Sequence, residues 1–379
     1  MQRDVYTYQM SCFRTFIILV ICLAAGGSSA ASLRPETIRV ALIKGAETLR
    51  MDGTGVLLTD GRGEPLRLDM PLEVRRVRDG ITVNGRSVAG LIASAPVRVT
   101  VNGKGYRALI EVTAADKGLL VVNELPLEEY LIGLINCEIS SAWPMEAVKS
   151  QAVIARSYAV YQKLARRGAP YQLESSVMDQ VYEGCDVEDS RAARGVQETA
   201  GEVLVYDEKV IQAFYHSNCA GHTENSKNVW GLSIPYLRGV ACQYCRESNP
   251  SKWELNLPLK KVEAALRGAG FPVAGVRELK VQGRNESGRV QEVAVGSARG
   301  RVAVPGVAFR KALGYSAVKS TNFELRVSGD DCLISGTGSG HGVGLCQWGA
   351  KQRAADGFAY REILSYYYPG VKLAKGYGR

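Results

Sequence analysis

Residues 125–158 read LPLEEYLIGLINCEISSAWPMEAVKSQAVIARSY, and they contain the change of hydrophobic period that decides the fold. Before Pro126, apolar residues alternate along short segments, whereas after it they recur at steps of three and four. This spacing predicts a short amphipathic helix that begins at Pro126. A second helix is expected to open near Pro144, because proline is favoured in the first turn of a helix.

The segment before these helices, residues 36–113, predicts a β-rich N-terminal unit. It contains short alternating runs such as residues 38–43 and 97–101. Glycine-containing turns at residues 52–53 and 60–61 separate such runs. Short alternating runs between turns of this kind are typical of antiparallel strands.

The segment after residue 113 mixes helical and strand patterns. Residues 202–206 and 210–215 predict a hairpin, and residues 258–330 predict an inserted β-rich segment with a small helix. Strands and helices are segregated along the chain rather than alternating, which favours the α+β class over a wound parallel sheet. We therefore expect a β-rich N-terminal unit followed by a mixed helical and β domain over residues 114–373.

The first thirty residues have the order of a secretory signal peptide. Arg3 and Arg14 precede an apolar run over residues 16–25, and small residues follow up to Ala30. This order predicts a signal peptide over residues 1–30, with export to the periplasm or cell envelope. If the leader is not cleaved, it would anchor the protein to the membrane.

The charge of the chain indicates which partners to expect. The 379 residues carry a formal net charge of +9, with ordinary globular proportions of hydrophobic and charged residues. Such a charge favours polyanionic partners, which in the cell envelope are carboxylate-bearing polymers and anionic lipids. Nucleic acid is not an expected partner, because no RNA-recognition, zinc-finger or helix-turn-helix signature is found and export argues against it.

Glu138 is the candidate catalytic residue. It stands at the end of the apolar helix, just before a turn that contains Trp143. Desolvation at such a position raises the pKa of a carboxyl group and makes it a usable general acid. A capping or solvated turn glutamate is the alternative interpretation of the same position.

Cysteine and histidine residues form two short pairs that predict a structural zinc site. The predicted ligands are Cys219, His222, Cys242 and Cys245, with His216 as the rival fourth ligand. A closed sphere of four protein ligands leaves no position for a reactive water. A disulfide from Cys219 to Cys242 or Cys245 is the alternative, because an exported protein meets an oxidising environment.

Two further cysteines lie near Glu138 and His341 in the sequence. Cys137 adjoins Glu138, and Cys346 lies in the glycine-rich segment after His341. A disulfide between Cys137 and Cys346 would tie the acid to that segment, and two free thiols in a packed site are the equal alternative.

The 125–158 stretch resembles the P-L-E-E-Y-L-x-G-V-x-x-x-E-[MI] and [WF]-P-x-E-A-[LV]-K-[AS]-Q-A-V-x-A-R-[ST]-Y motif of the stage II sporulation protein D family, also called SpoIID/LytB. Residues 179–182 (DQVY), 213–225 (AFYHSNCAGHTEN) and 340–350 (GHGVGLCQWGA) resemble further motifs in the same order. The resemblance covers about residues 36–373.

The resemblance implies a peptidoglycan lytic transglycosylase, in which Glu138 occupies the position of the catalytic acid. Such an enzyme cleaves the N-acetylmuramic acid to N-acetylglucosamine bond and leaves a 1,6-anhydromuramyl end. Members of the sporulation branch act on glycan stripped of its stem peptides. A non-catalytic wall-binding modulator of an N-acetylmuramoyl-L-alanine amidase is the alternative that the same family implies.

The family pattern also suggests substrate-binding residues. Lys149 and Arg156 match it seven residues apart on one helix face, where they are expected to steady developing charge or the muramyl carboxylate. Two solvated cations are the alternative. Four polar residues of the matched segments are expected to line the glycan groove: Gln180, Tyr182, His341 and Gln347.

Overall fold

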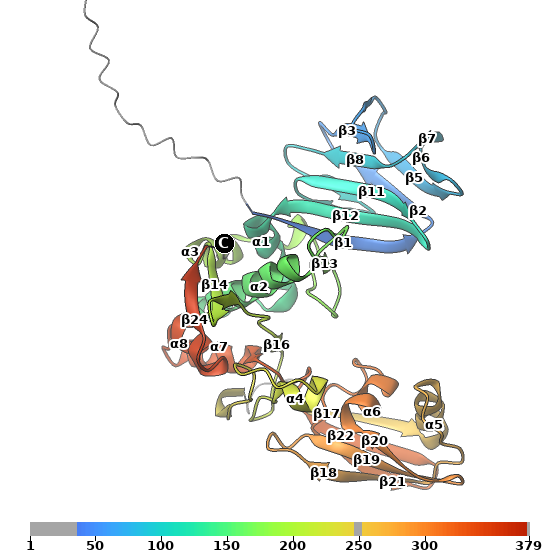
Figure 1. Ribbon diagram of the computed structural model, residues 1–379, viewed down its shortest axis with the longest axis vertical. Helices are drawn as coiled ribbons and strands as arrows, with labels where there is room; N and C mark the ends of the chain where they lie inside the picture. Colours follow the sequence, from blue (N-terminus) through green and yellow to red (C-terminus); the bar gives the residue numbers. More distant parts are fainter. Residues whose placement is uncertain (1–35, 246–251, 377–379) are drawn as a thin grey trace, which may run out of the picture. The chain divides into compact units, whose positions relative to one another are not determined.

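The computed structural model describes residues 36–245 and 252–376, so the predicted leader over residues 1–30 lies outside the described residues. The described chain is an α+β protein with a β-rich N-terminal part, as predicted (Figure 1). Within the described ranges, no helix has the length and apolar character required to cross a membrane.

The N-terminal part consists of antiparallel sheets around a shared apolar core. One sheet has the order β13 (Leu173–Glu174), β1 (Thr37–Ala46), β12 (Gly118–Pro126), β11 (Leu109–Ala115), β8 (Leu91–Ser94), β3 (Leu57–Asp60), β4 (Pro65–Leu66), in which only β13 pairs in parallel. Another has the order β10 (Lys104–Tyr106), β9 (Val99–Val101), β2 (Thr48–Asp52), β5 (Leu72–Val77), β6 (Gly80–Val83), β7 (Arg86–Val88). Alternate side chains of both sheets, such as Val40, Met51 and Ile81, are fully buried in this core.

Strand β12 passes directly into helix α1 (Leu127–Glu138) at Pro126. Proline has no N–H for a strand ladder but is compatible with the start of a helix, so the change of structure falls at this residue as predicted. The unit boundary that the sequence placed at residue 113 falls inside β11, because β11 and β12 continue the N-terminal sheet to Pro126. The largely buried run at residues 119–122 of β12 does not alternate, which hid the strand.

Helix α2 (Met145–Ala165) is the central element of the following part, and most of its residues are buried. It begins after Pro144, as predicted, and packs mainly against α1, α3 (Ser190–Glu198), β14 (Glu202–Tyr206), α7 (Gln347–Ala355) and α8 (Tyr360–Tyr367). Strand β14 lies between β15 (Lys209–Val210) and the C-terminal β24 (Lys372–Lys375).

The second strand of the predicted hairpin is shorter than expected. Strand β15 ends at Val210, and the chain then leaves the sheet to form β16 (Tyr215–His216). Strand β16 pairs in parallel with β23 (Leu345–Cys346), so that His216 stands opposite Cys346. The short elements that complete this part are η1 (Cys185–Val187), α4 (Ser226–Trp230) and η2 (Gln243–Cys245).

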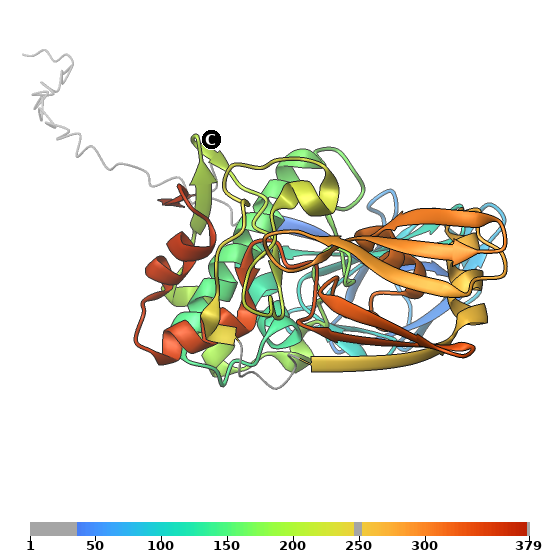
Figure 2. The ribbon, with the colours of Figure 1, turned by 90° about the horizontal axis from the view of Figure 1, so that it is seen from below.

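An inserted segment between η2 and β23 has an apolar core of its own. Its elements are β17 (Lys252–Pro258), α5 (Leu259–Gly268), β18 (Glu278–Arg284), β19 (Val290–Ser297), β20 (Gly300–Pro305), α6 (Gly306–Leu313), β21 (Phe323–Ser328) and β22 (Asp331–Thr337). In Figure 2 the orange strands β18 to β20 form a layer beside the red-orange hairpin of β21 and β22. The strands extend beyond the predicted range of residues 258–330 at both ends.

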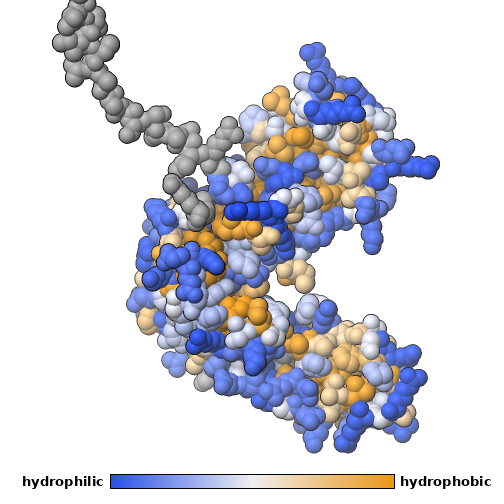
Figure 3. All heavy atoms as spheres, viewed as in Figure 1, coloured by the Kyte–Doolittle hydropathy of each residue, from blue (hydrophilic) through white to orange (hydrophobic). Residues whose placement is uncertain are grey.

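The face shown in Figure 3 is largely hydrophilic, with hydrophobic residues visible in small groups between charged side chains. The large hydrophobic side chains that are exposed include Leu57, Val97, Val177 and Met178. Val177 and Met178 are neighbours in the chain, whereas Leu57 and Val97 stand singly, and scattered exposed apolar residues are normal on a folded protein.

Candidate active site

Glu138 ends helix α1 and lines a pocket of about 390 Å³. Tyr130 and Leu134, two turns and one turn before Glu138 on α1, are buried in the N-terminal core, which fixes the last turn of the helix. The pocket lining comes from three separate segments and comprises Asn136, Cys137, Glu138, Ile139, Ser140, Trp143, Ser217, Gln347 and Trp348.

Burial raises the pKa of Glu138, and hydrogen bonds to the carboxylate offset part of the rise. The backbone N–H of Val181 donates to Oε1 at 3.0 Å, and the side chains of Tyr215 and Gln347 provide two more hydrogen bonds. The carboxyl group therefore keeps its proton to a higher pH than an ordinary glutamate. It also has donors in place when it ionises.

Gln180 lies behind the acid and orients one of these donors. The hydroxyl of Tyr130 donates to Oε1 of Gln180 at 3.1 Å, and Nε2 of Gln180 donates to the hydroxyl of Tyr215 at 3.2 Å. The hydroxyl of Tyr215 is thus left to donate to Glu138. Because Gln180 is fully buried, it acts on Glu138 through Tyr215 and does not line the pocket. The sequence missed Tyr215, although it lies in a matched motif.

Gln347 is the predicted groove residue that the structure brings to Glu138. It is the first residue of α7, it lines the pocket, and its side chain hydrogen-bonds the Glu138 carboxylate. Its Nε2 also donates to Oε1 of Gln151 on α2 at 3.3 Å. This second contact fixes the amide in the orientation that reaches the acid.

Lys149 and Arg156 do not reach the pocket, in contrast to the substrate-binding role predicted for them. Arg156 is fully buried and pairs with Glu128 of α1 at 2.7 Å, while Lys149 pairs with Glu146 at 2.8 Å and Glu198 at 2.7 Å. Carboxylates of the protein itself already neutralise the charges of these two cations. Their ion pairs with Glu128 and Glu198 hold α2 against α1 and α3.

Tyr182 also lies outside the pocket. Its side chain is buried, its hydroxyl donates to Oδ1 of Asn123 at 3.1 Å, and its ring centroid lies 5.0 Å from that of Tyr130. It is therefore a core residue of the joint between α1 and the N-terminal sheet.

His341 occupies a separate aromatic cluster. Its ring packs near His216 and Trp230 at centroid distances of 5.7 and 5.4 Å, and its Nδ1 accepts from the backbone N–H of Val343 at 3.0 Å. Burial lowers the pKa of His341 to about 3, so the ring is neutral and orders its own loop. It is not among the residues that line the Glu138 pocket.

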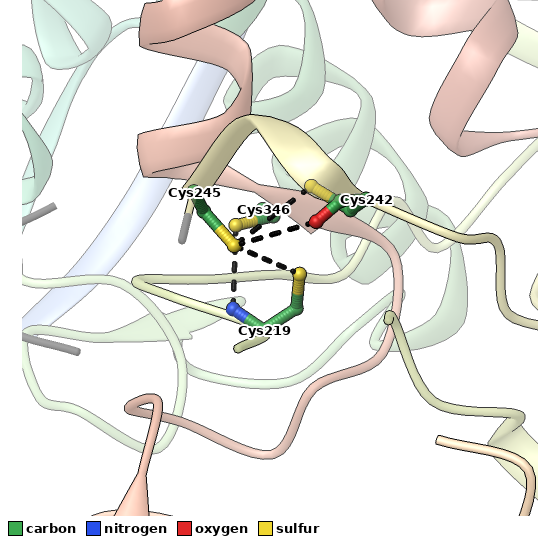
Figure 4. A group of neighbouring side chains, drawn as sticks. All are labelled: Cys219, Cys242, Cys245 and Cys346. Carbon is green, nitrogen blue, oxygen red and sulfur yellow. Dashed lines mark hydrogen bonds between the residues drawn. The ribbon is translucent and has the colours of Figure 1, made fainter. Parts of the chain in front are cut away.

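Four buried cysteines form a candidate metal centre: Cys219, Cys242, Cys245 and Cys346. Figure 4 shows their sulfur atoms facing one another, from the loop after β16, from η2 and from the start of α7. All four Sγ atoms lie within 4.8 Å of one another, with Cys219 and Cys245 3.3 Å apart. Zinc–sulfur bonds of about 2.3 Å in a tetrahedron place the sulfurs about 3.8 Å apart, so the donor set fits one such ion. A disulfide needs about 2.05 Å.

The fourth sulfur differs from the ligand that the sequence predicted. His222 lies outside the cluster, where its Nδ1 contacts the carbonyl oxygen of Thr223 at 2.6 Å. The rival His216 uses Nδ1 to bond the carbonyl oxygen of Val343 at 3.1 Å. Cys346 takes the place because the pairing of β16 with β23 brings it beside the loop that carries Cys219.

Cys346 therefore does not face Cys137. The Sγ of Cys137 donates to the carbonyl oxygen of Gly133 in its own helix at 3.4 Å, whereas the Sγ of Cys346 accepts from the backbone N–H of Cys219 at 3.3 Å. The disulfide considered between Cys137 and Cys346 is not formed.

The cysteine cluster and the acid are joined through the start of α7. Cys346 is the N-cap of this helix and accepts from the backbone N–H of Gly349, while the next residue, Gln347, hydrogen-bonds Glu138. Strand β16 carries Tyr215, the other side-chain donor to Glu138, beside β23. An ion held by the cluster would thus fix two of the three segments that contact the acid, those of Tyr215 and Gln347.

The fold and this site define an α+β protein with one half-buried acid in an open pocket edged by indole rings. A family model for stage II sporulation protein matches residues 115–206, and a domain of unknown function, DUF8618, matches residues 243–344. The chain is 33% identical over 299 residues to an uncharacterized protein of Brachyspira hyodysenteriae, covering 78% of this chain and 80% of that protein.

The chain is also 30% identical over 276 residues to stage II sporulation protein D of Bacillus subtilis, covering 67% of this chain and 76% of that protein. It is 29% identical over 292 residues to the amidase enhancer of Bacillus subtilis, covering 64% of this chain and 40% of that protein. The chain belongs to the SpoIID/LytB family.

Proposed function

We propose that this chain is a peptidoglycan lytic transglycosylase that cleaves the bond between N-acetylmuramic acid and N-acetylglucosamine to give 1,6-anhydromuramyl ends. The observation that carries this proposal is the environment of Glu138, a desolvated carboxyl group at a pocket wall with three hydrogen-bond donors aimed at it. Among the described residues that line the pocket, Glu138 provides the carboxyl group. One carboxyl group suffices for non-hydrolytic cleavage.

In the proposed reaction, protonated Glu138 gives its proton to the glycosidic oxygen as the bond from the anomeric carbon to that oxygen breaks. The carboxylate so formed takes the proton of the muramyl 6-hydroxyl, whose oxygen bonds to the anomeric carbon. Glu138 ends protonated, and no water is consumed. The Val181 N–H and the side chains of Tyr215 and Gln347 stabilise the transient carboxylate.

We further propose that the cysteine cluster holds a structural zinc ion. Its ligands would be Cys219, Cys242, Cys245 and Cys346, and the closed sulfur sphere would supply rigidity rather than chemistry. The hydroxyl of Tyr367 lies 3.1 Å from the Sγ of Cys242, where it can donate to a thiolate.

The proposal places the protein in the cell envelope after export, with glycan strands, in particular peptide-stripped strands, as substrate. The stage II sporulation protein D relatives support a role connected with the cell wall. A second candidate function is a non-catalytic wall-binding modulator of a cell-wall amidase, which the similarity to the amidase enhancer of Bacillus subtilis favours.

The two candidate functions are separated by incubating purified protein with intact and with peptide-stripped peptidoglycan, beside Glu138→Gln. Chromatography of the soluble products is expected to show new glycan ends from the wild type and none from the variant. Binding to both glycans without products from either, by protein with native metal content, would favour the modulator.

A further inference from the structure

Two indole rings and one ammonium group form a cluster at the edge of the Glu138 pocket. The ring centroids of Trp143 and Trp348 lie 5.2 Å apart with their planes at 53°. The Nζ of Lys351 lies 4.4 Å from the Trp348 ring centroid and 5.2 Å from that of Trp143. Both indoles line the pocket that contains Glu138, so the ammonium is held beside the pocket as well.

The position of this cluster is fixed by two separate elements. Trp348 and Lys351 are three residues apart on α7 and thus share one face of that helix. The backbone N–H of Trp348 donates to the carbonyl oxygen of Ser217 at 3.1 Å. Trp143 precedes α2, and its carbonyl oxygen accepts from Nη2 of Arg191 at 3.0 Å. The rings therefore need little ordering when a ligand arrives.

The cluster has the properties of a binding surface rather than of core packing. Both indoles and Lys351 are half-buried, so that each keeps some contact with solvent. Lys149 on the neighbouring helix is neutralised by Glu146 and Glu198, whereas the contacts that the described residues give to the Lys351 ammonium are the two aromatic faces. Aromatic faces attract a cation without cancelling its charge, so Lys351 can still bind an anion.

We propose that Trp143, Trp348 and Lys351 form a subsite for a sugar ring that carries a carboxylate. The apolar face of the sugar packs on an indole, and the carboxylate accepts a charge-assisted hydrogen bond from the ammonium. This inference rests on the proposed function, in which the ring is a muramic acid residue with a free lactyl carboxylate. Lys351 then has the role that the sequence assigned to Lys149 and Arg156.

The subsite makes a chemical distinction that the acid alone cannot make. N-acetylglucosamine has no carboxylate, and an amide at the lactyl position has no charge, so both lose the bond to Lys351. Because the hydrogen bond to the ammonium is charge-assisted, replacing the carboxylate by an amide is expected to weaken binding about tenfold or more.

The test measures dissociation constants by calorimetry for full-length Glu138→Gln, which binds without cleaving. The ligands are the tetrasaccharide of alternating N-acetylglucosamine and N-acetylmuramic acid and the same tetrasaccharide with lactyl methylamides. The carboxylate ligand is expected to bind about tenfold more tightly. Adding Lys351→Gln should remove this preference, whereas Lys351→Arg should retain it. Lys311→Gln, an equal charge change at an exposed position of helix α6, is the control and should also retain it.

Each outcome separates this inference from the proposed function. Equal affinity for the two ligands, or a preference that survives Lys351→Gln, overturns the subsite even if wild-type protein cleaves glycan. A preference that depends on Lys351 in a protein that forms no anhydro ends would uphold the subsite and overturn the proposed reaction. Because the comparison of two ligands uses a single protein, a folding defect of the lysine variant cannot mimic the result.

Discussion

Gly349 lies where helix α7 meets the cysteine cluster, and we predict that Gly349→Ala destabilises the protein. An added Cβ would lie 2.1 Å from the hydroxyl oxygen of Tyr367 and 2.7 Å from the Sγ of Cys242, and both of these residues are buried. Contacts that close force the two side chains to move. Because they are 3.1 Å apart, the shift also disturbs the bond between them.

The size of the change in the free energy of unfolding follows from two destabilising effects and one stabilising effect. Overpacking a buried site costs about 1–3 kcal/mol, and a disturbed hydrogen bond costs about 1 kcal/mol more. Replacing glycine by alanine within a helix returns up to about 1 kcal/mol. We therefore expect Gly349→Ala to lower the free energy of unfolding by about 1–3 kcal/mol and to weaken metal retention.

The assay is denaturant unfolding of the metal-loaded protein, with Gly268→Ala as the matched control. Gly268 is the last residue of α5, and an added Cβ there would meet no atom within 4 Å. The control should be neutral or slightly stabilised, since only the helix propensity changes. If both variants unfold at the same denaturant concentration, the inferred packing of α7 against the cluster is refuted.

Three further predictions concern the acid, the internal ion pair and the ligands. Cleavage should fall as pH rises through the raised pKa of Glu138, because the general acid must be protonated. Tyr215→Phe removes a donor to the carboxylate and so raises this pKa further. The pH–rate profile of the variant should therefore fall at a higher pH, with a rate about ten- to hundredfold lower than that of the wild type. Arg156→Met should lower the free energy of unfolding by about 3 kcal/mol while the KM for glycan stays unchanged, and a rise in KM would contradict the structural role. Elemental analysis should find one zinc per chain in the wild type and in His222→Ala but little in Cys346→Ser. Zinc in Cys346→Ser and little in His222→Ala would instead support His222 as the fourth ligand.

The positions of α1 and Glu138 could be predicted because local signals decide them. The change of hydrophobic period at Pro126 and the apolar face of the helix lie within one short stretch, and the structure starts α1 after this residue and ends it at Glu138. The strand β12 was missed for the opposite reason, since its largely buried residues 119–122 show no alternation.

The partners of charged and sulfur-containing residues could not be predicted, because they come from distant segments. Arg156 meets Glu128 from another helix, and nothing in the spacing of Lys149 and Arg156 shows which side of α2 faces the pocket. Likewise, Cys346 joins the cysteine cluster only through the parallel pairing of β16 with β23, a contact between residues far apart in the sequence. Spacing within one segment favoured His222 instead.

Cleavage of glycan by Glu138 without water is tested by mass spectrometry of the products formed in water labelled with a heavy oxygen isotope. Wild-type protein is expected to give muramyl ends that lack one water and carry no label, and Glu138→Gln is expected to give none of these ends. Reducing ends that contain the label would show hydrolysis and refute the transglycosylase reaction.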